Sequence, residues 1–512
     1  MSLITGDKII IAFAVLLVGW LVSLVRTALR PEFGNIPGPW VAKFTQAWRI
    51  GLVWKGSAHE EYKLLHEKYG PIVRTAPNVV DISDPTSIAT IYGISSKFLK
   101  SPFYQTLSVF YQDKVMDSMF TTTDPQEHKA LKRPVAQKFS MSSLRTLEYL
   151  VDPCSDIFTN AMLDLQGQVV DLGEWAQWYA FDVIGAITFS RRFGFMENRK
   201  DVKNIISGID LGLAYAGIIG QVPSLHRYLL GNLTLRRILR KIAGLRNQRL
   251  TDRTGQMVSD CIREYDSQPY SSERADFLAY FRQEQKSTGQ QMSQRDLMNH
   301  LMNNLLAGSD TTGISLRSIF YYLLHDKSAY KTLQNEIDEA DKAGKLSPII
   351  TFSESLELEF LQACIKEAMR MHPAVSYPLE RVVPPEGVRL CGEYLSGGTI
   401  VGVNAAVIHR NRDISGQDAD TFRPERWLHG NEEHIKLMDR HNLAFGSGAR
   451  TCIGKNISIM EMSKFVPQVL RQFDLEWASS EPGWRVKTYW FAKQTGLLVR
   501  FHRRDKICPS RR

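Results

Sequence analysis

Hydrophobic residues form one unbroken block near the start of the chain. Ile9–Val25 is almost entirely apolar, which is about the length of a helix that crosses a lipid bilayer. Arg26 and Arg30 follow this block, so the positive-inside rule predicts a single-pass anchor with the rest of the chain in the cytosol. A cleaved signal peptide is the alternative, but no small-residue cleavage site follows the block. We expect an anchor over residues 1–30 and a globular domain over residues 31–512.

Beyond the anchor, helical periodicity dominates and short extended runs lie near the two ends of the domain. The clearest helix is predicted over Gln294 to Asp326, where Ser293 and Asp296 have the spacing of a capping box. Other helices are expected at Glu127–Phe139 and Phe360–Met371. The extended runs lie at residues 72–74, 79–82, 388–395, 399–403 and 495–501. The pattern predicts a mainly α fold with small β-sheets.

Composition narrows the class of protein. The chain of 512 residues is 44% hydrophobic and 23% charged, which is typical of an ordered globular protein. Its six cysteines are scattered, which argues against a disulfide scaffold and suits a reducing compartment. A net charge of +9 suits a membrane surface or an acidic protein partner. No nucleic-acid-binding motif is present in the sequence, so no nucleic acid partner is expected.

The strongest chemical signal is a glycine-rich loop around one cysteine. Phe445-Gly446-Ser447-Gly448-Ala449-Arg450-Thr451-Cys452-Ile453-Gly454 precedes a helical pattern. Glycine lets such a loop turn, and Gly454 leaves room for a flat ligand next to the sulfur. Backbone N–H groups after Cys452 would stabilise a thiolate, and Arg450 could bind an anionic group of the same ligand. The alternative is a buried free cysteine under a turn.

A second signal lies in the middle of the long helix. Ala307-Gly308-Ser309-Asp310-Thr311-Thr312 is rich in poor helix formers. Thr311 can donate a hydrogen bond to the Ala307 carbonyl and open the helix locally. A groove with a hydroxyl and an acid beside it can bind O₂ and deliver protons. A polar helix kink without chemistry is the alternative.

These segments together resemble the cytochrome P450 family, in its microsomal type. The proline hinge Ile36-Pro37-Gly38-Pro39-Trp40, the pair Glu367-x-x-Arg370 and Arg426 in Phe422–Trp427 match further family motifs in the family's order. In detail the chain looks most like fungal pisatin-demethylase-like members. The resemblance implies the cytochrome P450 fold, a haem-thiolate catalytic domain over residues 31–512, and a structural lock made by Glu367, Arg370 and Arg426.

The resemblance also implies which residues hold haem b. Cys452 would be the axial iron ligand, and Asp310 and Thr311 would relay protons. Arg450 and Arg381 match family positions that bind the haem propionates. Where the family commonly has Trp-x-x-x-Arg, this chain has His128 and Lys132, so the charge is kept but the guanidinium fork is lost. The full set expected around the haem is Cys452, Arg450, Arg381, His128, Lys132, Phe445, Gly446 and Gly454.

The implied reaction is the insertion of one oxygen atom from O₂ into a lipophilic small molecule, in fungal secondary metabolite biosynthesis. NADPH electrons would come from a membrane-bound reductase, with cytochrome b5 as a further donor, at the endoplasmic reticulum membrane. Two alternatives stay open: a haem-thiolate isomerase or dehydratase, and a non-catalytic membrane-anchored haem protein. Family regions suggest an apolar substrate wall made of Phe103, Tyr104, Asn303, Ala307, Val375, Tyr377, Leu379, Trp490 and Phe491.

Overall fold

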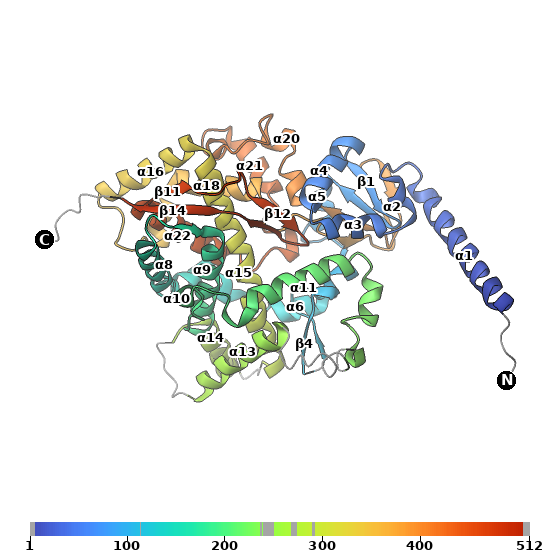
Figure 1. Cartoon of the computed structure of the whole chain (residues 1–512), viewed down its shortest axis with the longest axis horizontal. Helices are drawn as coiled ribbons and strands as arrows, with labels where there is room; N and C mark the ends of the chain where they lie inside the picture. The colour runs from blue at the N-terminus through green and yellow to red at the C-terminus, as the bar shows by residue number, and fades with distance from the viewer. Residues whose placement is uncertain are drawn as a thin grey trace.

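The computed structural model describes residues 6–112, 114–235, 238, 250–267, 274–288 and 292–504. Helix α1 (Gly6–Ala28) projects away from the body, and the body itself is built mainly of helices with small sheets (Figure 1). Residues 1–5 of the predicted anchor and residues 505–512 of the predicted globular domain lie outside the described residues. The mainly α architecture predicted from the hydrophobic pattern is confirmed.

Helix α15 (Gln294–His325) runs through the middle of the body (Figure 1). It packs against α9 (Leu172–Phe189), α18 (Glu359–Met371) and α22 (Lys455–Gln472), and its buried side chains join the largest hydrophobic core. The predicted helix is therefore confirmed almost to the residue. At its start the Asp296 N–H donates to the Ser293 hydroxyl at 3.0 Å. The Asp296 carboxylate accepts from that same hydroxyl, so the reciprocal backbone bond of a capping box is replaced by a side-chain bond.

The other helices surround α15 and α9. Before α9 they are α2 (Trp40–Phe44), α3 (Ala47–Lys55), α4 (Ala58–Tyr69), α5 (Ser87–Tyr92), α6 (Pro125–Lys132), α7 (Met141–Arg145) and α8 (Asp152–Asp164). Between α9 and α15 lie α10 (Phe195–Asn198), α11 (Ile205–Ile219), α13 (Leu250–Ser267) and α14 (Phe277–Thr288). After α15 come α16 (Lys327–Lys342), α17 (Phe352–Leu356), α19 (Ala405–Ile408), α20 (Arg412–Ser415) and α21 (Glu432–His441). Short 3₁₀ turns cover residues 31–33, 102–107, 136–139, 148–150, 202–204, 223–228, 424–427 and 448–450.

The strands form one five-stranded sheet, one three-stranded sheet and three hairpins. The largest sheet has the order β1 (Ile72–Ala76), β2 (Val79–Ile82), β10 (Ile400–Val403), β7 (Arg381–Val382) and β3 (Leu99–Lys100), with β10 parallel to β2. The second sheet has the order β11 (Phe473–Trp477), β14 (Leu498–Arg503) and β6 (Val169–Asp171). The hairpins pair β4 (Val109–Tyr111) with β5 (Lys114–Met116), β8 (Val388–Leu390) with β9 (Glu393–Leu395), and β12 (Arg485–Thr488) with β13 (Ala492–Thr495). The sheet strands thus join segments from both ends of the chain, as the extended runs predicted.

Three predicted elements differ from the observed ones. The helix expected over residues 127–139 ends at Lys132, because Pro134 has no N–H to continue it. A separate 3₁₀ turn then covers Ala136–Phe139. The single run at 388–395 is the hairpin β8–β9. The run at 495–501 is divided between β13 and β14 by a turn at Gly496, whose φ is +90°.

Two apolar helical stretches stand out among the described residues. Phe13–Ala28, within the 23-residue helix α1, is apolar. Val202–Ile219 is long and apolar enough to cross a membrane, and 28% of it is buried inside the protein. Part of this second stretch lines an internal cavity, where Ile209, Leu213 and Ala216 of α11 contribute side chains. Its apolar character therefore has an explanation within the body of the protein.

Candidate active site

The loop before α22 turns the Cys452 side chain toward the centre of the protein. The Cys452 N–H donates to the Phe445 carbonyl at 2.9 Å and closes the loop. Burial raises the pKa of the Cys452 thiol above its usual value, and the hydrogen bonds from the Gly454 and Lys455 N–H groups, which the sequence predicted, offset only part of this effect. A Cβ added at Gly454 would approach only the Cys452 Sγ, at 3.9 Å. The space on that side of the sulfur is thus open to a ligand.

Glycine is required at two other positions of this loop. Gly446 and Gly448 have φ angles of +68° and +63°, which side chains rarely adopt. At Gly448 a Cβ would lie 1.7 Å from the Tyr92 carbonyl oxygen at the end of α5. No side chain could be placed there without moving the backbone, so Gly448 fixes the loop against the N-terminal part of the body.

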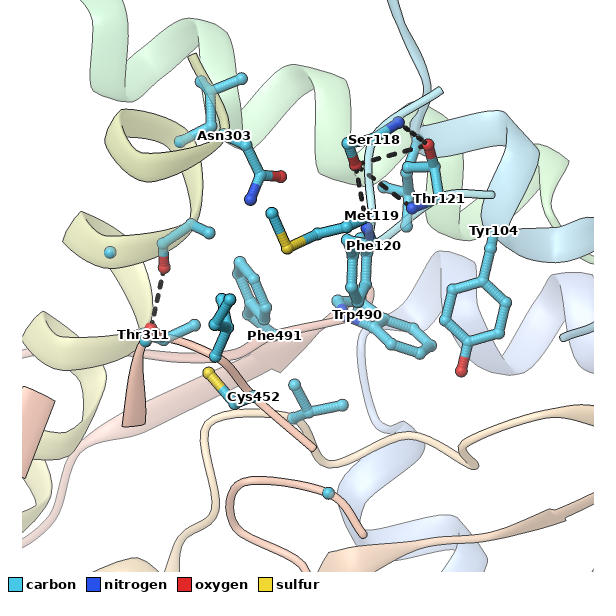
Figure 2. Close-up of a pocket in the computed structure, with 18 of the residues that line it drawn as sticks. Tyr104, Ser118, Met119, Phe120, Thr121, Asn303, Thr311, Cys452, Trp490 and Phe491 are labelled. Atoms are coloured by element: carbon cyan, nitrogen blue, oxygen red, sulfur yellow. Dashed lines mark hydrogen bonds between the residues drawn. The ribbon is translucent and has the colours of Figure 1, made fainter. Parts of the chain in front are cut away.

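A cavity of about 700 Å³ lies over Cys452. Cys452 points into it from one side and Thr311 from α15, while Trp490, Phe491 and Tyr104 form part of its wall (Figure 2). Most of its lining side chains are apolar or aromatic. Among the described residues that line it there is no aspartate or glutamate. The cavity therefore brings a cysteine sulfur, a hydroxyl group and an apolar wall together.

The structure separates the two residues of the predicted proton relay. Thr311 lines the cavity, and its hydroxyl donates to the Ala307 carbonyl at 2.9 Å, as expected; the helix nevertheless continues through this segment. Asp310 does not line the cavity and is 2% exposed. Its carboxylate instead accepts a hydrogen bond from Gln177 of α9. Residues one apart on a helix point about 100° apart, which is why adjacent residues face different neighbours.

Five cationic or imidazole side chains meet at one edge of the cavity, and we call them the cationic rim: Lys100, His128, Lys132, Arg381 and Arg450. Burial lowers the pKa of Arg450 to about 10, with the charge of Arg381 adding to the effect. Burial, with the charges of Arg450, Lys132 and Lys100, lowers the pKa of His128 to about 4. Within the described part of the chain, none of the five forms a salt bridge with a carboxylate. They donate to carbonyl and hydroxyl oxygens instead: Lys132 to Ala449, Arg381 to Tyr104, and Arg450 to Thr122.

Lys100 is the member of the rim that the sequence did not reveal. It is 6% exposed, donates to the Phe120 carbonyl, and its ammonium lies 4.1 Å from the centres of the Tyr104 and Phe120 rings. Burial holds its pKa well below the usual value, and the charges of Arg381 and Arg450 add to this effect. The side chain lies outside every motif in the sequence. Only its burial without a carboxylate partner identifies it.

The three residues predicted to form a lock are in contact away from the cavity. Arg370 donates to both carboxylate oxygens of Glu367 at 2.8 Å, and Arg426 donates to one of them at 2.9 Å. Trp427 and the Arg423 N–H add two more bonds to this carboxylate. Burial raises the pKa of Glu367, but the two arginines outweigh it, and the pKa lies below its usual value. All three side chains are buried, so this contact is not a solvated surface pair.

Most of the predicted substrate wall lines the cavity, but two residues do not. The residues at its surface are Tyr104, Asn303, Ala307, Val375, Leu379, Trp490 and Phe491, and Asn303 belongs to α15, the helix that also carries Thr311 (Figure 2). Phe103 and Tyr377 are fully buried behind this wall and stack on each other. Tyr377 is held there because its hydroxyl donates to Gln221 and accepts from Arg49. Their placement in the wall was therefore wrong.

Comparisons with known proteins agree with this geometry. The cytochrome P450 family profile matches residues 34–494. The chain belongs to the cytochrome P450 family. It is 37% identical to cytochrome P450 monooxygenase gsfF of Penicillium aethiopicum, over 94% of this chain and 96% of the relative. It is 36% identical to cytochrome P450 monooxygenase cicH of Emericella nidulans, over 95% and 97% of the two chains.

Cytochrome P450 monooxygenase mpaDE of Penicillium roqueforti is also 36% identical, over 92% of this chain but 55% of its own length. The protein is thus an oxidoreductase of the monooxygenase class, built on the cytochrome P450 fold. The family implies a haem held by a cysteine thiolate and electrons supplied by a reductase. The open side of Gly454, the hydrogen-bonded sulfur of Cys452 and the unpaired cations of the rim fit such a group.

Proposed function

We propose that this cytochrome P450 binds haem b through the thiolate of Cys452 and oxidises a neutral, lipophilic small molecule in the cavity above it. One observation carries the proposal. The sulfur and the cationic rim lie at the edge of one cavity, so an iron ligand and counter-ions for two carboxylates are supplied together. When bound, haem supplies the activation of O₂ and the transfer of one oxygen atom.

The chain's own residues then have separate tasks. Lys100, Arg381 and Arg450 hold the two propionates, with His128 and Lys132 beside them. Gly446 and Gly454 leave space for the macrocycle, and Phe445 lines the same side. Thr311 offers its hydroxyl over the cavity for proton transfer, with Asp310 as the acid behind it. The apolar wall excludes water from the reacting atoms.

The substrate class is inferred from the lining of the cavity. Tyr104, Trp490 and Phe491 supply aromatic surface, and Asn303 on α15 is a polar side chain facing the cavity (Figure 2). No carboxylate lines the cavity in the described part of the chain, so a cationic substrate would enter without a counter-charge. We infer a neutral, largely aromatic or alicyclic molecule with one hydrogen-bonding group that Asn303 orients. The fungal relatives support a place in fungal secondary metabolite biosynthesis.

We further propose that residues 1–30 anchor the protein in the endoplasmic reticulum membrane, with the domain over 31–512 in the cytosol. The projecting α1 and its apolar sequence support this arrangement. A membrane-bound NADPH reductase, with cytochrome b5 as a second donor, would supply electrons. Exposed Lys129 and Arg133 flank Lys132, which is bonded to the cysteine loop, so positive charge lies next to the loop for an acidic partner.

The test is to express the full chain with an NADPH reductase and record the spectrum of the reduced protein with carbon monoxide. A strongly red-shifted Soret band is expected, and Cys452→Ser should abolish it. The matched control is Cys364→Ser, a buried cysteine in the core away from the cavity. Retention of the band in Cys452→Ser would overturn the proposal. NADPH-dependent product formation from fed neutral metabolites then separates a monooxygenase from an isomerase or dehydratase.

A further inference from the structure

A buried layer of polar side chains lies between α9 and α15, on the side of α15 that faces away from the cavity. Gln177 of α9 bonds with both ends of its amide. The nitrogen donates to the Asp310 carboxylate, and the oxygen accepts from Arg317 Nη2 at 2.8 Å. Asp310 and Arg317 are seven residues apart on α15, about two turns, and so share one face. The single amide therefore bridges an acid and a guanidinium.

The backbone explains how the amide reaches both groups. Gly313 lies between Asp310 and Arg317 on the same face of α15, and a Cβ there would lie 3.2 Å from the Gln177 Cα. The glycine lets the two helices approach closely at this point. Arg317 is fixed from a second side, because its Nε donates to the Gly173 carbonyl of α9 at 2.9 Å. The geometry of the layer is thus set by both helices.

The layer is buried but not fully satisfied. Asp310, Arg317 and Gln177 are each 3% exposed or less. Asp310 Oδ2 and Arg317 Nη1 have no partner among the described residues, and neither does Oε1 of the neighbouring Gln494, whose amide nitrogen donates to the Ile314 carbonyl of α15. Buried polar atoms are almost always paired with protein or with ordered water. Two acceptors and one donor are thus left without a protein partner among the described residues in this part of the core, and ordered water is the usual partner of such groups.

Charges from three elements and one amide act on Asp310, and together with burial they place its pKa at about 6. Burial is the largest cause and raises the pKa, and the charge of Asp210 of α11 acts in the same direction. Lys493 of β13, Arg317 of α15 and the Gln177 amide lower it. Lys493 and Asp210 pair with each other at 2.7 Å at the partly exposed edge of the layer. Arg317 in turn is near Asp171 and Glu174, whose charges oppose the effect of burial on it.

We propose that Gln177 is a positioning residue that stands between Asp310 and Arg317, prevents them from forming an ion pair, and so keeps Asp310 available as the proton carrier of the reaction. Ordered water completes the layer and returns protons from the surface at Lys493 and Asp210. In each cycle the protonated carboxyl gives its proton to the hydroxyl of the adjacent Thr311 as that hydroxyl passes its own proton into the cavity. The carboxylate then takes one proton from this water, so the charge is restored. The role of this proton in oxygen chemistry rests on the proposed function. The effect of Gln177 on the protonation of Asp310 does not.

The alternative role for Gln177 is a purely structural crosslink between α9 and α15. Two substitutions of Gln177 distinguish this role from the positioning role. Gln177→Ala opens the gap, so Arg317 can pair directly with Asp310 and favour its ionised form. Gln177→Leu removes the donor but still fills the gap, so Asp310 loses its hydrogen bond and its protonated form is favoured. The two apolar variants should therefore shift the titration of Asp310 in opposite directions, by about one pH unit each. A crosslink alone predicts loss of stability in both and no shift.

The first measurement is an infrared pH titration of the carboxyl stretch, assigned by its loss in Asp310→Asn. It needs no turnover, so its result stands even if haem binding or monooxygenation fails. The second is the ratio of product to hydrogen peroxide across pH, which should follow the same shifts. Gln334→Leu is the control, because Gln334 is a buried glutamine that donates to Asp474 far from this layer. Shifts of the same sign in both Gln177 variants, or none, would overturn the proposal.

Discussion

The lock and the cationic rim both contain several positively charged side chains inside the protein. The lock also contains a carboxylate, and the rim, among the described residues, does not. In the lock, Arg370 and Arg426 share the carboxylate of Glu367, and every charge has a bonded partner. In the rim, Lys100, Arg381 and Arg450 donate to carbonyl and hydroxyl oxygens, and none of the three pairs with a carboxylate in the described part of the chain. Removing the anion from a complete buried cluster costs stability because it leaves uncompensated charges, whereas an incomplete cluster carries that cost until an anion arrives. Removing a charge should therefore have opposite effects in the two places.

The largest effect on stability is expected in the lock. Glu367→Ala leaves two buried guanidinium groups without a carboxylate, which costs about 3–5 kcal/mol. We expect little folded protein and no retained haem, measured by thermal melting and by haem content. Lys366→Ala is the control, because Lys366 pairs with Asp439 on the surface of the same helix and should cost less than about 1 kcal/mol. A folded, haem-replete but slow Glu367→Ala protein would show that the lock is not required for folding.

Asp310 is a buried acid that belongs neither to the lock nor to the cationic rim. Its contribution to the stability of the folded protein depends on pH. Its folded pKa, about 6, lies above the ordinary value of 3.8, so the folded protein holds the proton more tightly than the unfolded chain. The stability that it contributes is complete below about pH 4 and is lost as pH rises through about 6, a change of about 2–3 kcal/mol. Asp310→Asn should remove this loss.

Denaturation at a series of pH values measures this difference. The variant should gain stability relative to the wild type as pH rises from about 4 to 7. The exposed Asp413→Asn serves as control and should give a constant difference. A constant difference for Asp310→Asn as well would mean that Asp310 stays ionised inside the folded protein.

In the rim, removing a charged side chain should raise the stability of the haem-free protein instead of lowering it. Lys100→Met replaces a buried, uncompensated ammonium by an apolar chain of similar length, so the haem-free protein should gain about 1–2 kcal/mol of stability. The same variant should lose haem about tenfold faster, because one charge-assisted bond to a propionate is missing. Melting of the haem-free protein and transfer of haem to an acceptor protein measure the two effects. The exposed Lys114→Met should change neither, and a destabilised haem-free Lys100→Met protein would contradict the comparison.

The smallest effect on stability is expected at Thr311. Thr311→Ala removes one hydroxyl bond to the Ala307 carbonyl and should change stability by less than about 1 kcal/mol. Product should nevertheless fall by up to about 10²-fold, with more hydrogen peroxide and a smaller fall in NADPH use. The control is Ser309→Ala, whose hydroxyl makes the same kind of bond to Leu305 outside the cavity lining. Equal falls in product and NADPH use without extra peroxide would remove Thr311 from the relay.

The sequence predicted features whose cause is local. The helix from Gln294 follows from its N-cap and periodicity, and the turns at Gly446 and Gly448 follow from glycine itself. Glu367 and Arg370, three apart on one helix, were predicted to pair, and Arg426 was added by the family resemblance alone.

What the sequence missed depends on contacts between distant segments. Lys100 lies in no motif and becomes significant only because the fold buries it against Tyr104 and Phe120. Gln177 meets Asp310 across 133 residues of chain. Family regions placed Tyr377 in the cavity wall. No local pattern shows that its hydroxyl is hydrogen-bonded to Arg49 and Gln221 behind that wall. Pairings of this kind are decided by packing rather than by spacing along one element.

The contact between Gly448 and Tyr92 has a consequence for how the protein is made. During synthesis the helix that ends at Tyr92 leaves the ribosome more than 350 residues before Gly448, whose loop must close against it. The cavity is lined from Lys100 to Phe491, so its walls cannot be complete until nearly the whole chain has emerged. If haem binds at Cys452 as proposed, we expect its capture to follow the synthesis of most of the chain, because Phe491 belongs to the wall of the cavity.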